Sequence, residues 1–526
     1  MGRETGVASA TRVSRRSFLR GLGAVGGTFI LGTPPARGQA AGPRLGSSLF
    51  TLGVASGDPA PDSVVLWTRL APKPLDEGGG MPPDPVTVRW EVADDQQFSR
   101  VIASGTVDVV AADAHTVHVE VRGLESDRGY WYRFRAGGEV SRTGHTRTTP
   151  GRGAPVDCLC IAIASCQHYE VGYFGAYRRM IEDGARLIVH LGDYIYENRS
   201  REKVIRRTHK IVQPRSLDEY RRHHALYRTD ADLQEAHAMV PWAPIWDDHD
   251  VENDYAGDAS PTLESNEFLA RRAAAYRAYW EHLPLRPAAL PRGSSMTIHR
   301  QLVFGDLLEL SLLDERQYRS RQACALPKSW GRLLDGCDER LDGKRTMLGT
   351  DQENWVIGHV GRAGARWTAV AQGVMFAPLL QGNPGTPQHW SDGWDGYPAA
   401  RQKMLEHLAA PTVSNPVVLS GDIHSFWVND LVREGGGANP IGTEFVTTSI
   451  TSPLGRHADE GFRKAKDRNP HVRAYEGDHR GYVLATVTRD RWRVDLRGVD
   501  CSSGTQRAST VTSYATHAGR PGGVKV

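Results

Sequence analysis

The chain lacks the features that would place it in a membrane or on nucleic acid. None of its internal apolar runs approaches the ~20 residues that a transmembrane helix needs. Its 64 basic and 61 acidic residues leave a net charge of only +3, which is too balanced to indicate nucleic acid as an obligate partner. No repeat or low-complexity segment interrupts the sequence. We therefore expect a soluble mature protein, and 526 residues are enough for two or more domains.

The N-terminus carries a targeting segment. Ser14-Arg15-Arg16-Ser17-Phe18-Leu19-Arg20 matches a twin-arginine signature, a mild apolar region follows, and small residues near Ala40 offer a cleavage site. We interpret residues 1–41 as a twin-arginine signal peptide; the alternative is a basic disordered tail. Because this route moves folded proteins, a metal site can be filled before export. The expected partner during export is the twin-arginine translocase, and the expected location is secreted, periplasmic or cell-envelope.

Cysteine is scarce, with six residues in the chain. Cys324 and Cys337 flank a short loop and are the best candidates for a disulfide, which an oxidising destination permits. Cys158 and Cys160 stand two apart on one predicted strand, so they share a face but lie too far apart along it to pair comfortably. Cys166 is interpreted as a metal ligand, with a buried free thiol as the alternative.

Two domains and a tail are predicted. Residues 46–150 contain short strands rich in β-branched and aromatic residues, separated by Gly, Pro and Asp turns, which predicts a β-sandwich. Leu124 followed by Tyr130 resembles the tyrosine corner of immunoglobulin-like and fibronectin-like domains. Between 157 and 505, apolar strands alternate with helical segments, which indicates α/β layers. Residues 506–526 are expected to form a C-terminal tail.

One predicted strand ends in residues suited to binding metal. The apolar run from 187 to 191 stops at Gly192, and Asp193 and Tyr196 follow. A strand that ends in a glycine turn delivers the next side chains to the crevice where open α/β folds bind ligands. An aspartate there can bridge two metal ions, and a phenolate oxygen suits ferric iron. Alone, this motif is weak, because Gly-Asp is also a common turn pair.

Three other predicted strands end in donor residues in the same way. The segments that follow them are Ser165-Cys166-Gln167-His168, Asp247-Asp248-His249-Asp250 and Gly421-Asp422-Ile423-His424. Each could be a surface turn with incidental acidic or imidazole groups. Four copies of one strand-then-donor layout instead favour a shared metal site.

These motifs resemble those of the metallophosphoesterase superfamily and, more closely, of the PhoD-like alkaline phosphatase and phosphodiesterase family. Similar stretches also occur at 227–230, 313–319, 394–398 and 443–446. The resemblance implies an α/β fold of four layers, an αββα sandwich, behind an N-terminal immunoglobulin-like or fibronectin-like β-sandwich. It also implies an enzyme, a phosphoric ester hydrolase that acts on phosphomonoesters and phosphodiesters.

The resemblance further implies a site for Fe³⁺ and Ca²⁺. The residues at the positions of the iron ligands are Cys166, Asp193, Tyr196 and His424. Asp193 would also bridge to calcium, whose expected ligands are Asp248 and Asp422, with Asn253 and Asp254 completing that site or holding another calcium. An oxygen-rich set with few imidazoles favours a hard cation and argues against a pair of zinc ions. His168 remains open between a ligand and a residue that supports one.

The expected reaction is in-line attack on phosphorus by a metal-activated hydroxide. Asp248, His249 and Arg316 are the predicted catalytic residues. His249 would donate a hydrogen bond to the phosphoryl or leaving oxygen, or alternatively orient Asp248. Arg316 and the basic segment 199–228 are candidates for phosphate contacts, although a solvated basic face is the simpler interpretation for most of that segment.

Phosphate esters are the expected substrates, with cell-wall teichoic acid and phospholipid headgroups among the candidates. A secreted nuclease or nucleotidase on the same scaffold is the alternative, and it would favour a longer basic groove than the modest charge indicates. A non-catalytic adhesion protein would leave four metal motifs unexplained. The loop from 381 to 398, dense in Gly, Pro and Trp, is typical of loops that shape substrate access.

Overall fold

The computed structural model describes residues 48–211, 213–433, 439–504 and 507–526. The twin-arginine segment at residues 1–41 lies outside the described residues. Within the described ranges, none of the helices combines the length and the apolar character needed to cross a membrane.

The largest sheet has ten strands, and its centre is parallel. In sheet order the strands are β25 (Arg520–Lys525), β24 (Ala508–His517), β23 (Arg491–Val499), β22 (Gly481–Thr488), β9 (Cys158–Ala164), β10 (Leu187–Leu191), β11 (Trp242–Ile245), β1 (Val54–Ala60), β2 (Ser63–Arg69) and β5 (Thr116–Arg122). β10 is buried along its whole length, as a strand covered on both faces must be.

A second sheet has seven strands, four of which run parallel. Its order is β12 (Arg300–Phe304), β13 (Leu308–Leu312), β15 (Trp367–Ala371), β18 (Pro416–Ser420), β20 (Gly442–Val446), β19 (Phe426–Leu431) and β21 (Val472–Glu476). Side chains of both sheets meet in one apolar core, to which Ile163 of β9 and Leu310 of β13 belong.

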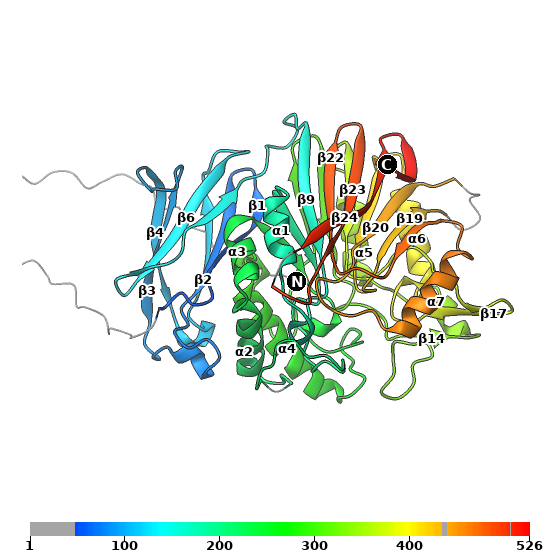
Figure 1. Ribbon diagram of the computed structural model, residues 1–526, viewed down its shortest axis with the longest axis horizontal. Helices are drawn as coiled ribbons and strands as arrows, with labels where there is room; N and C mark the ends of the chain where they lie inside the picture. The colour runs from blue at the N-terminus through cyan, green and yellow to red at the C-terminus, as the bar shows by residue number, and fades with distance from the viewer. Residues whose placement is uncertain (1–47, 212, 434–438, 505–506) are drawn as a thin grey trace, which may run out of the picture. The chain divides into compact units, whose positions relative to one another are not determined.

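Helices cover the outer faces of the two sheets. The core of the ten-stranded sheet includes residues of α1 (Ala176–Glu182), α2 (Leu217–Arg228), α3 (Ala231–Met239) and α4 (Ser265–His282). A second core joins the seven-stranded sheet to α5 (Gly349–His359), α6 (Pro398–Leu408) and α7 (Arg456–Lys466). In Figure 1, α2 and α3 lie to the left of β9 and β22, between these central strands and the N-terminal strands β3 and β4, whereas α6 and α7 lie at the right. The fold is therefore the expected αββα sandwich.

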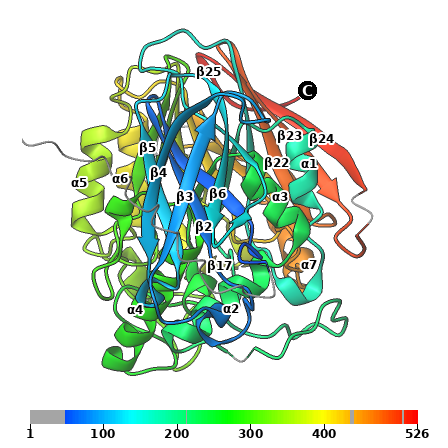
Figure 2. The same ribbon diagram turned by 90° about the vertical axis from the view of Figure 1, so that its left-hand side faces the viewer.

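The N-terminal β-sandwich pairs a small sheet with the end of the large one. Figure 2 looks onto the small sheet, whose strands are β4 (Val101–Val109), β3 (Val86–Ala93), β6 (Gly129–Ala136), β7 (Glu139–Val140) and β8 (Gly144–Arg147). Its apolar side chains pack on those of β1, β2 and β5. The hydroxyl of Tyr130 accepts a hydrogen bond from the Glu125 N–H at 2.9 Å, which confirms the tyrosine corner.

The sandwich is hydrogen-bonded to the central sheet, because β1 pairs in parallel with β11 at Gly57 and Trp242. A Cβ atom on Gly57 would lie 2.5 Å from the Pro284 carbonyl oxygen, so this crossing requires glycine. The two parts of the fold thus share one continuous sheet.

The last residues of the chain are not a tail. Residues 508–525, expected to extend beyond the catalytic fold, form β24 and β25 at the edge of the ten-stranded sheet. Their many Thr, Ser and Gly residues leave much of this edge exposed, so the segment lacks the apolar run that marks a buried strand.

A small three-stranded sheet joins β14 (Leu333–Leu334), β17 (Thr386–Trp390) and β16 (Gln381–Asn383). Beside it, Cys324 and Cys337 form the expected disulfide, with their Cα atoms 6.3 Å apart. Cys158, Cys160 and Cys166 are free, and Cys166 is buried.

Candidate metal centre

The four donor motifs converge at the strand ends of the two sheets. Cys166 follows β9, Asp193 follows β10, Asp248 follows β11, and Asp422 and His424 follow β18. The ligand atoms of Cys166, Asp193 and His424 lie within 4.8 Å of one another, and so do those of Asp247, Asp248 and Asp422. Residues far apart in sequence thus form one acidic cluster.

The backbone at these strand ends is unusual. Cys166, Asp193, Asp422 and His424 have φ values of 60°, 54°, 64° and 56°, in the left-handed region that non-glycine residues rarely adopt. Such conformations cluster at functional sites, where the surrounding structure holds them. Gly192 has a φ of 105°, and a Cβ there would lie 2.4 Å from the Asp247 Cβ, so the turn before Asp193 requires glycine.

Asp193 occupies the centre of the cluster. Its ligand atom lies within 4.8 Å both of those of Cys166 and His424 and of those of Asp248 and His249. It is fully buried, and neither carboxylate oxygen has a hydrogen-bond partner among the described residues. Burial and the neighbouring carboxylates raise the pKa of Asp193 well above its usual value. An unpaired buried carboxylate is costly, so this position fits a cation.

The lone pair of the His424 Nε2 lies at the same place. Its Nδ1 lies 3.0 Å from the Pro453 carbonyl oxygen, which can only accept, so Nδ1 carries the hydrogen and Nε2 does not. The Nε2 lies 3.1 Å from the Tyr196 hydroxyl. Burial lowers the pKa of His424 to about 3, which keeps the ring neutral, as a metal ligand must be. Burial raises the pKa of both Cys166 and Tyr196.

A second group of oxygens lies around Asp248. Its carboxylate accepts hydrogen bonds from the N–H groups of His249 and Asp254, at 2.9 and 2.6 Å. The carboxylates of Asp254 and Asp392 also lie within 4.8 Å of it. Asp392 was not predicted. In the sequence, Asp392 is marked only by its place in the loop from 381 to 398. That loop was expected to shape substrate access and not to contribute to the metal centre.

Arg316 belongs to the acidic cluster. It is fully buried, and its Nε donates to Asp247 while one terminal nitrogen donates to Asp392 at 2.8 Å and lies 3.7 Å from Asp248. Arg316 does not line the cleft beside the centre, so these contacts make it a counter-charge for the carboxylates. The expected phosphate contact stays a prediction, since the Nη2 of Arg316 has no hydrogen-bond partner among the described residues.

A cleft of about 470 Å³ opens beside the centre, lined by His168, Tyr196, His249 and His424. The His249 Nδ1 lies 2.7 Å from a Glu197 carboxylate oxygen, and the other oxygen of Glu197 accepts the Asn253 N–H at 2.9 Å. Burial opposes the charge on His249, but Glu197 and then Asp193 raise its pKa well above the usual value. The Nδ1–H is thus directed at Glu197, and the protonated form of the ring also carries an Nε2–H that can donate.

Only the backbone N–H of His249 bonds Asp248, so the geometry favours the donor role over the alternative that its imidazole orients Asp248. Glu197 was not among the predicted site residues, although it directly follows Tyr196, the last residue of the motif that begins at Gly192. Asn253 lines the cleft next to these groups, and Glu197 fixes its backbone.

His168 lies outside the donor groups around Asp193 and Asp248. Its Nδ1 accepts a hydrogen bond from the Glu170 N–H at 3.3 Å, so the proton of the neutral ring is on Nε2. Burial lowers the pKa of His168 to about 3, which keeps the ring neutral. The ring packs on Tyr196 with centroids 4.6 Å apart. Of the two interpretations left open, the geometry favours a residue that supports the phenol.

Part of the basic segment 199–228 is structural, and its remaining Lys and Arg residues are exposed: Arg199, Arg201, Lys203, Arg206, Lys210 and Arg215. Arg207 pairs with Asp230, Arg221 with Glu281 and Arg222 with Asp218, while Arg228 is buried over the Trp67 ring. Arg199 and Arg201 line the cleft, and so does Lys328. The basic groups that reach the cleft are thus few among the described residues, which matches the modest net charge.

Comparisons with known proteins agree with this architecture. The family model of the PhoD-like phosphatase matches residues 161–496, and that of the PhoD-like phosphatase N-terminal domain matches residues 37–150. The chain belongs to the PhoD-like phosphatase family. It is 44% identical over 503 residues to alkaline phosphatase D of Bacillus subtilis, covering 92% of this chain and 84% of that protein.

Two solved structures of phosphatases are similar to this structure. A structure of PhoD superposes with a TM-score of 0.87 at 42% identity, covering 92% of this chain and 93% of that one. A purple acid phosphatase from yellow lupin has a TM-score of 0.54 at 10% identity, covering 88% and 73%, and shares the fold. The αββα layers of this PhoD-like phosphatase thus occur in a protein of very different sequence.

A Glu197 variant tests whether the pairing of His249 with the Glu197 carboxylate contributes to activity. We expect Glu197→Gln to lower turnover about 10–100-fold, because the imidazolium loses the carboxylate that stabilises its charge. The pH at which activity is lost on the alkaline side should also fall, because the pKa of His249 falls. Steady-state rates across pH measure both effects, with Glu202→Gln, an exposed glutamate of the same cleft, as the control. An unchanged rate and profile would contradict this role.

Proposed function

We propose that the chain hydrolyses phosphomonoesters and phosphodiesters with Fe³⁺ and Ca²⁺ held on either side of Asp193. As a PhoD-like phosphatase it is a phosphoric ester hydrolase. The observation that carries the metal proposal is the Asp193 carboxylate, which is fully buried, has no hydrogen-bond partner among the described residues and lies within reach of two donor groups.

Iron is proposed for the group of Cys166, Asp193, Tyr196 and His424. Thiolate, phenolate and neutral imidazole together suit a redox-active transition metal better than calcium, which prefers oxygen alone. Burial opposes ionisation of the Cys166 thiol and the Tyr196 phenol, as their raised pKa values indicate, so only a strongly charged cation would hold both as anions. These are the features that support a ferric ion here.

Calcium is proposed for the carboxylates on the other side of Asp193. The ligand oxygens are those of Asp248 and Asp422, with Asp254 and Asn253 nearby. Burial and the Asp247 and Asp248 carboxylates raise the pKa of Asp422 well above its usual value, which is the electrostatic consequence of crowding anions without a cation. Oxygen-only ligation favours a hard, exchangeable ion.

When bound, the two metals would supply Lewis acidity toward the phosphoryl oxygens and an activated water as the nucleophile. The protein's own groups complete the site. His249, charged by its pairing with Glu197, donates from Nε2 into the cleft, where a phosphoryl or leaving oxygen would lie. Arg316 holds Asp247 and Asp392 in place. Because Arg316 donates its hydrogen bonds to these two carboxylates, the Asp248 carboxylate is available to bind metal.

The proposed substrates are phosphate esters small enough for the cleft or presented at its mouth, with teichoic acid and phospholipid headgroups among the candidates. Arg199, Arg201 and Lys328 provide a limited basic rim rather than the long groove that a nuclease needs. We assign residues 46–150 to the N-terminal β-sandwich and place the catalytic domain from residue 157 onward.

Export through the twin-arginine translocase to a secreted, periplasmic or cell-envelope location is part of the proposal. Its basis is Arg15-Arg16 together with a site that binds iron best in a folded protein. Replacing both arginines by lysine should retain active enzyme inside the cell, as activity assays on separated cell fractions would measure. Normal release of that variant would rule this route out.

Hydrolysis of a simple aryl phosphomonoester, the corresponding diester and DNA tests the activity directly. We expect both aryl esters to be hydrolysed faster than DNA, because the basic rim is short. Each rate should be lost on mild calcium chelation and restored by added calcium, since that cation carries part of the phosphoryl charge.

Two outcomes would contradict the proposal. A preference for DNA would support the nuclease alternative. Rates that survive chelation, or that only zinc restores, would overturn the assignment of calcium.

Tyr196 provides a spectroscopic test of the iron assignment. The purified protein should be violet, because a phenolate bound to Fe³⁺ absorbs visible light by charge transfer. Tyr196→Phe should lose this band while keeping its circular dichroism. Tyr194→Phe is the matched control: it removes a buried phenol that contacts His237 rather than the centre, so it should keep the band. A colourless, iron-free and fully active wild-type protein would exclude the assignment.

A further inference from the structure

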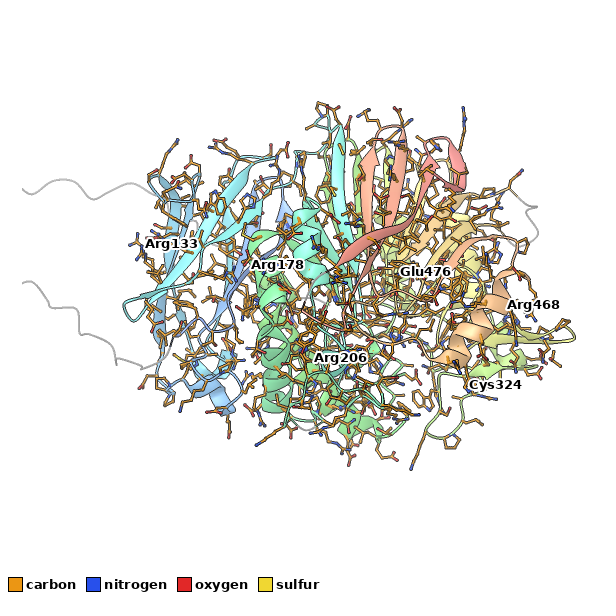
Figure 3. The ribbon with its side chains drawn as sticks, in the orientation of Figure 1. Arg133, Arg178, Arg206, Cys324, Arg468 and Glu476 are labelled. Atoms are coloured by element: carbon orange, nitrogen blue, oxygen red, sulfur yellow. A yellow bond between two sulfur atoms is a disulfide. The ribbon has the colours of Figure 1, made fainter. Side chains whose placement is uncertain are left out.

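We propose that the loop closed by the Cys324–Cys337 disulfide positions the carboxylates of the second metal site, and that Gln322 is its positioning residue. This inference rests on the proposed function, because Asp254 is proposed to lie at that metal, and the Asp392 carboxylate lies within 4.8 Å of those of Asp248 and Asp254. Figure 3 marks Cys324, and the loop that begins there carries Lys328 to the lining of the cleft. The loop is therefore a wall of the site.

Gln322 joins the two carboxylate-bearing segments. Its side chain is buried, with 1% exposed, and its Nε2 donates to the Asp392 carboxylate at 2.5 Å and to the Asp254 backbone oxygen at 2.9 Å. Asp254 lies in the turn after β11, and Asp392 lies after β17. These segments come from different parts of the chain, and the Gln322 amide bonds both of them directly.

The loop makes a second contact with Asp254. The N–H of Gly331, inside the disulfide-closed ring, donates to the Asp254 carboxylate at 3.1 Å. A Cβ on Gly331 would lie 2.7 Å from the other oxygen of that carboxylate, so a larger residue here would displace the Asp254 side chain. Asp254 in turn donates its own N–H to Asp248 at 2.6 Å. The disulfide-closed loop thus contacts Asp254 directly and reaches Asp248 through it.

The loop also holds the segment that leads to Asp392. Ser391 exchanges hydrogen bonds with Arg332: its N–H donates to the Arg332 carbonyl and its hydroxyl accepts the Arg332 N–H, both at 2.9 Å. Strand β14 pairs with β17 at Leu333 and Trp390. Trp390 and Ser391, the two residues before Asp392, are therefore hydrogen-bonded to the loop that the disulfide closes.

The disulfide reinforces a loop whose own core is small, with Trp330 and Leu334 as its large buried apolar side chains. Its buried apolar cluster consists of Ala323, Leu334 and Cys337, with Cys324 packed against it. Residues 326–329 are exposed. A segment with so little apolar burial depends on a covalent link to stay ordered. The bridge, with a sequence separation of 13, begins two residues after Gln322 and encloses Gly331.

Removing the Gln322 side chain should change the position of Asp392 relative to Asp254, but it should not remove the positive charges beside Asp392. Arg316 and Arg319 also bind the Asp392 carboxylate, at 2.8 and 3.0 Å, and with burial opposing them they lower its pKa to about 2. Asp392 therefore keeps its counter-charges when the amide is absent. The tie between Asp392 and Asp254 is what the variant would lose.

The test measures Ca²⁺ binding to the iron-containing protein by titration calorimetry. Three variants are compared with wild type: Gln322→Ala, the double variant Cys324→Ser with Cys337→Ser, and the control Gln402→Ala, which alters an amide on the surface of α6. We expect the Ca²⁺ affinity to fall about 10–100-fold in the first two and to stay unchanged in the control. The visible iron band should persist in all three, which also shows that they are folded.

A metal-independent measurement separates this inference from the proposed function. Hydrogen exchange of the peptides that contain Asp254 and Asp392, in calcium-free protein, should be faster in Gln322→Ala and in the double variant. Faster exchange in a protein whose wild type binds no Ca²⁺ would overturn the calcium assignment and leave the positioning role intact. Unchanged affinity together with unchanged exchange would overturn the positioning role.

Discussion

The site depends on a buried negative charge that the protein alone does not neutralise. Asp193 lies at the end of the central strand β10, fully buried, with both oxygens unpaired among the described residues. Asp248 and Asp422 add further carboxylates within a few ångströms. Removing so many anions from water is unfavourable unless cations take the place of water. Among the described residues, Arg316, Arg319 and the His249 imidazolium compensate only part of this charge.

The sandwich makes this concentration of charge possible. Parallel strands in both sheets end at the same place, so each turn that follows a strand contributes donors without a dedicated binding loop. The left-handed backbone at Cys166, Asp193, Asp422 and His424 turns those side chains inward. The surrounding hydrogen bonds hold the imidazoles of the site in place: Pro453 fixes the tautomer of His424, and Glu197 raises the pKa of His249.

The sequence alone predicted the layers, the strands and the convergence of the four motifs, because buried strands are apolar and their ends are marked by glycine and donor residues. It could not predict Glu197, Gln322 or Asp392, since their roles depend on contacts between loops distant in sequence. The phosphate contact expected of Arg316 stays a prediction: an arginine in a motif can face a substrate or a carboxylate, and the contacts that the structure shows are with carboxylates. The polar strand β24 lacked the apolar run by which strands were recognised.

The most direct test of the account is the metal content of the protein purified from its own host without added metal. Elemental analysis together with electron paramagnetic resonance measures which ions occupy the centre and whether the iron is ferric. The account predicts ferric iron in an amount equal to the protein, together with calcium that dialysis against a mild chelator removes. Zinc at both positions, or active protein that contains no iron, would contradict it.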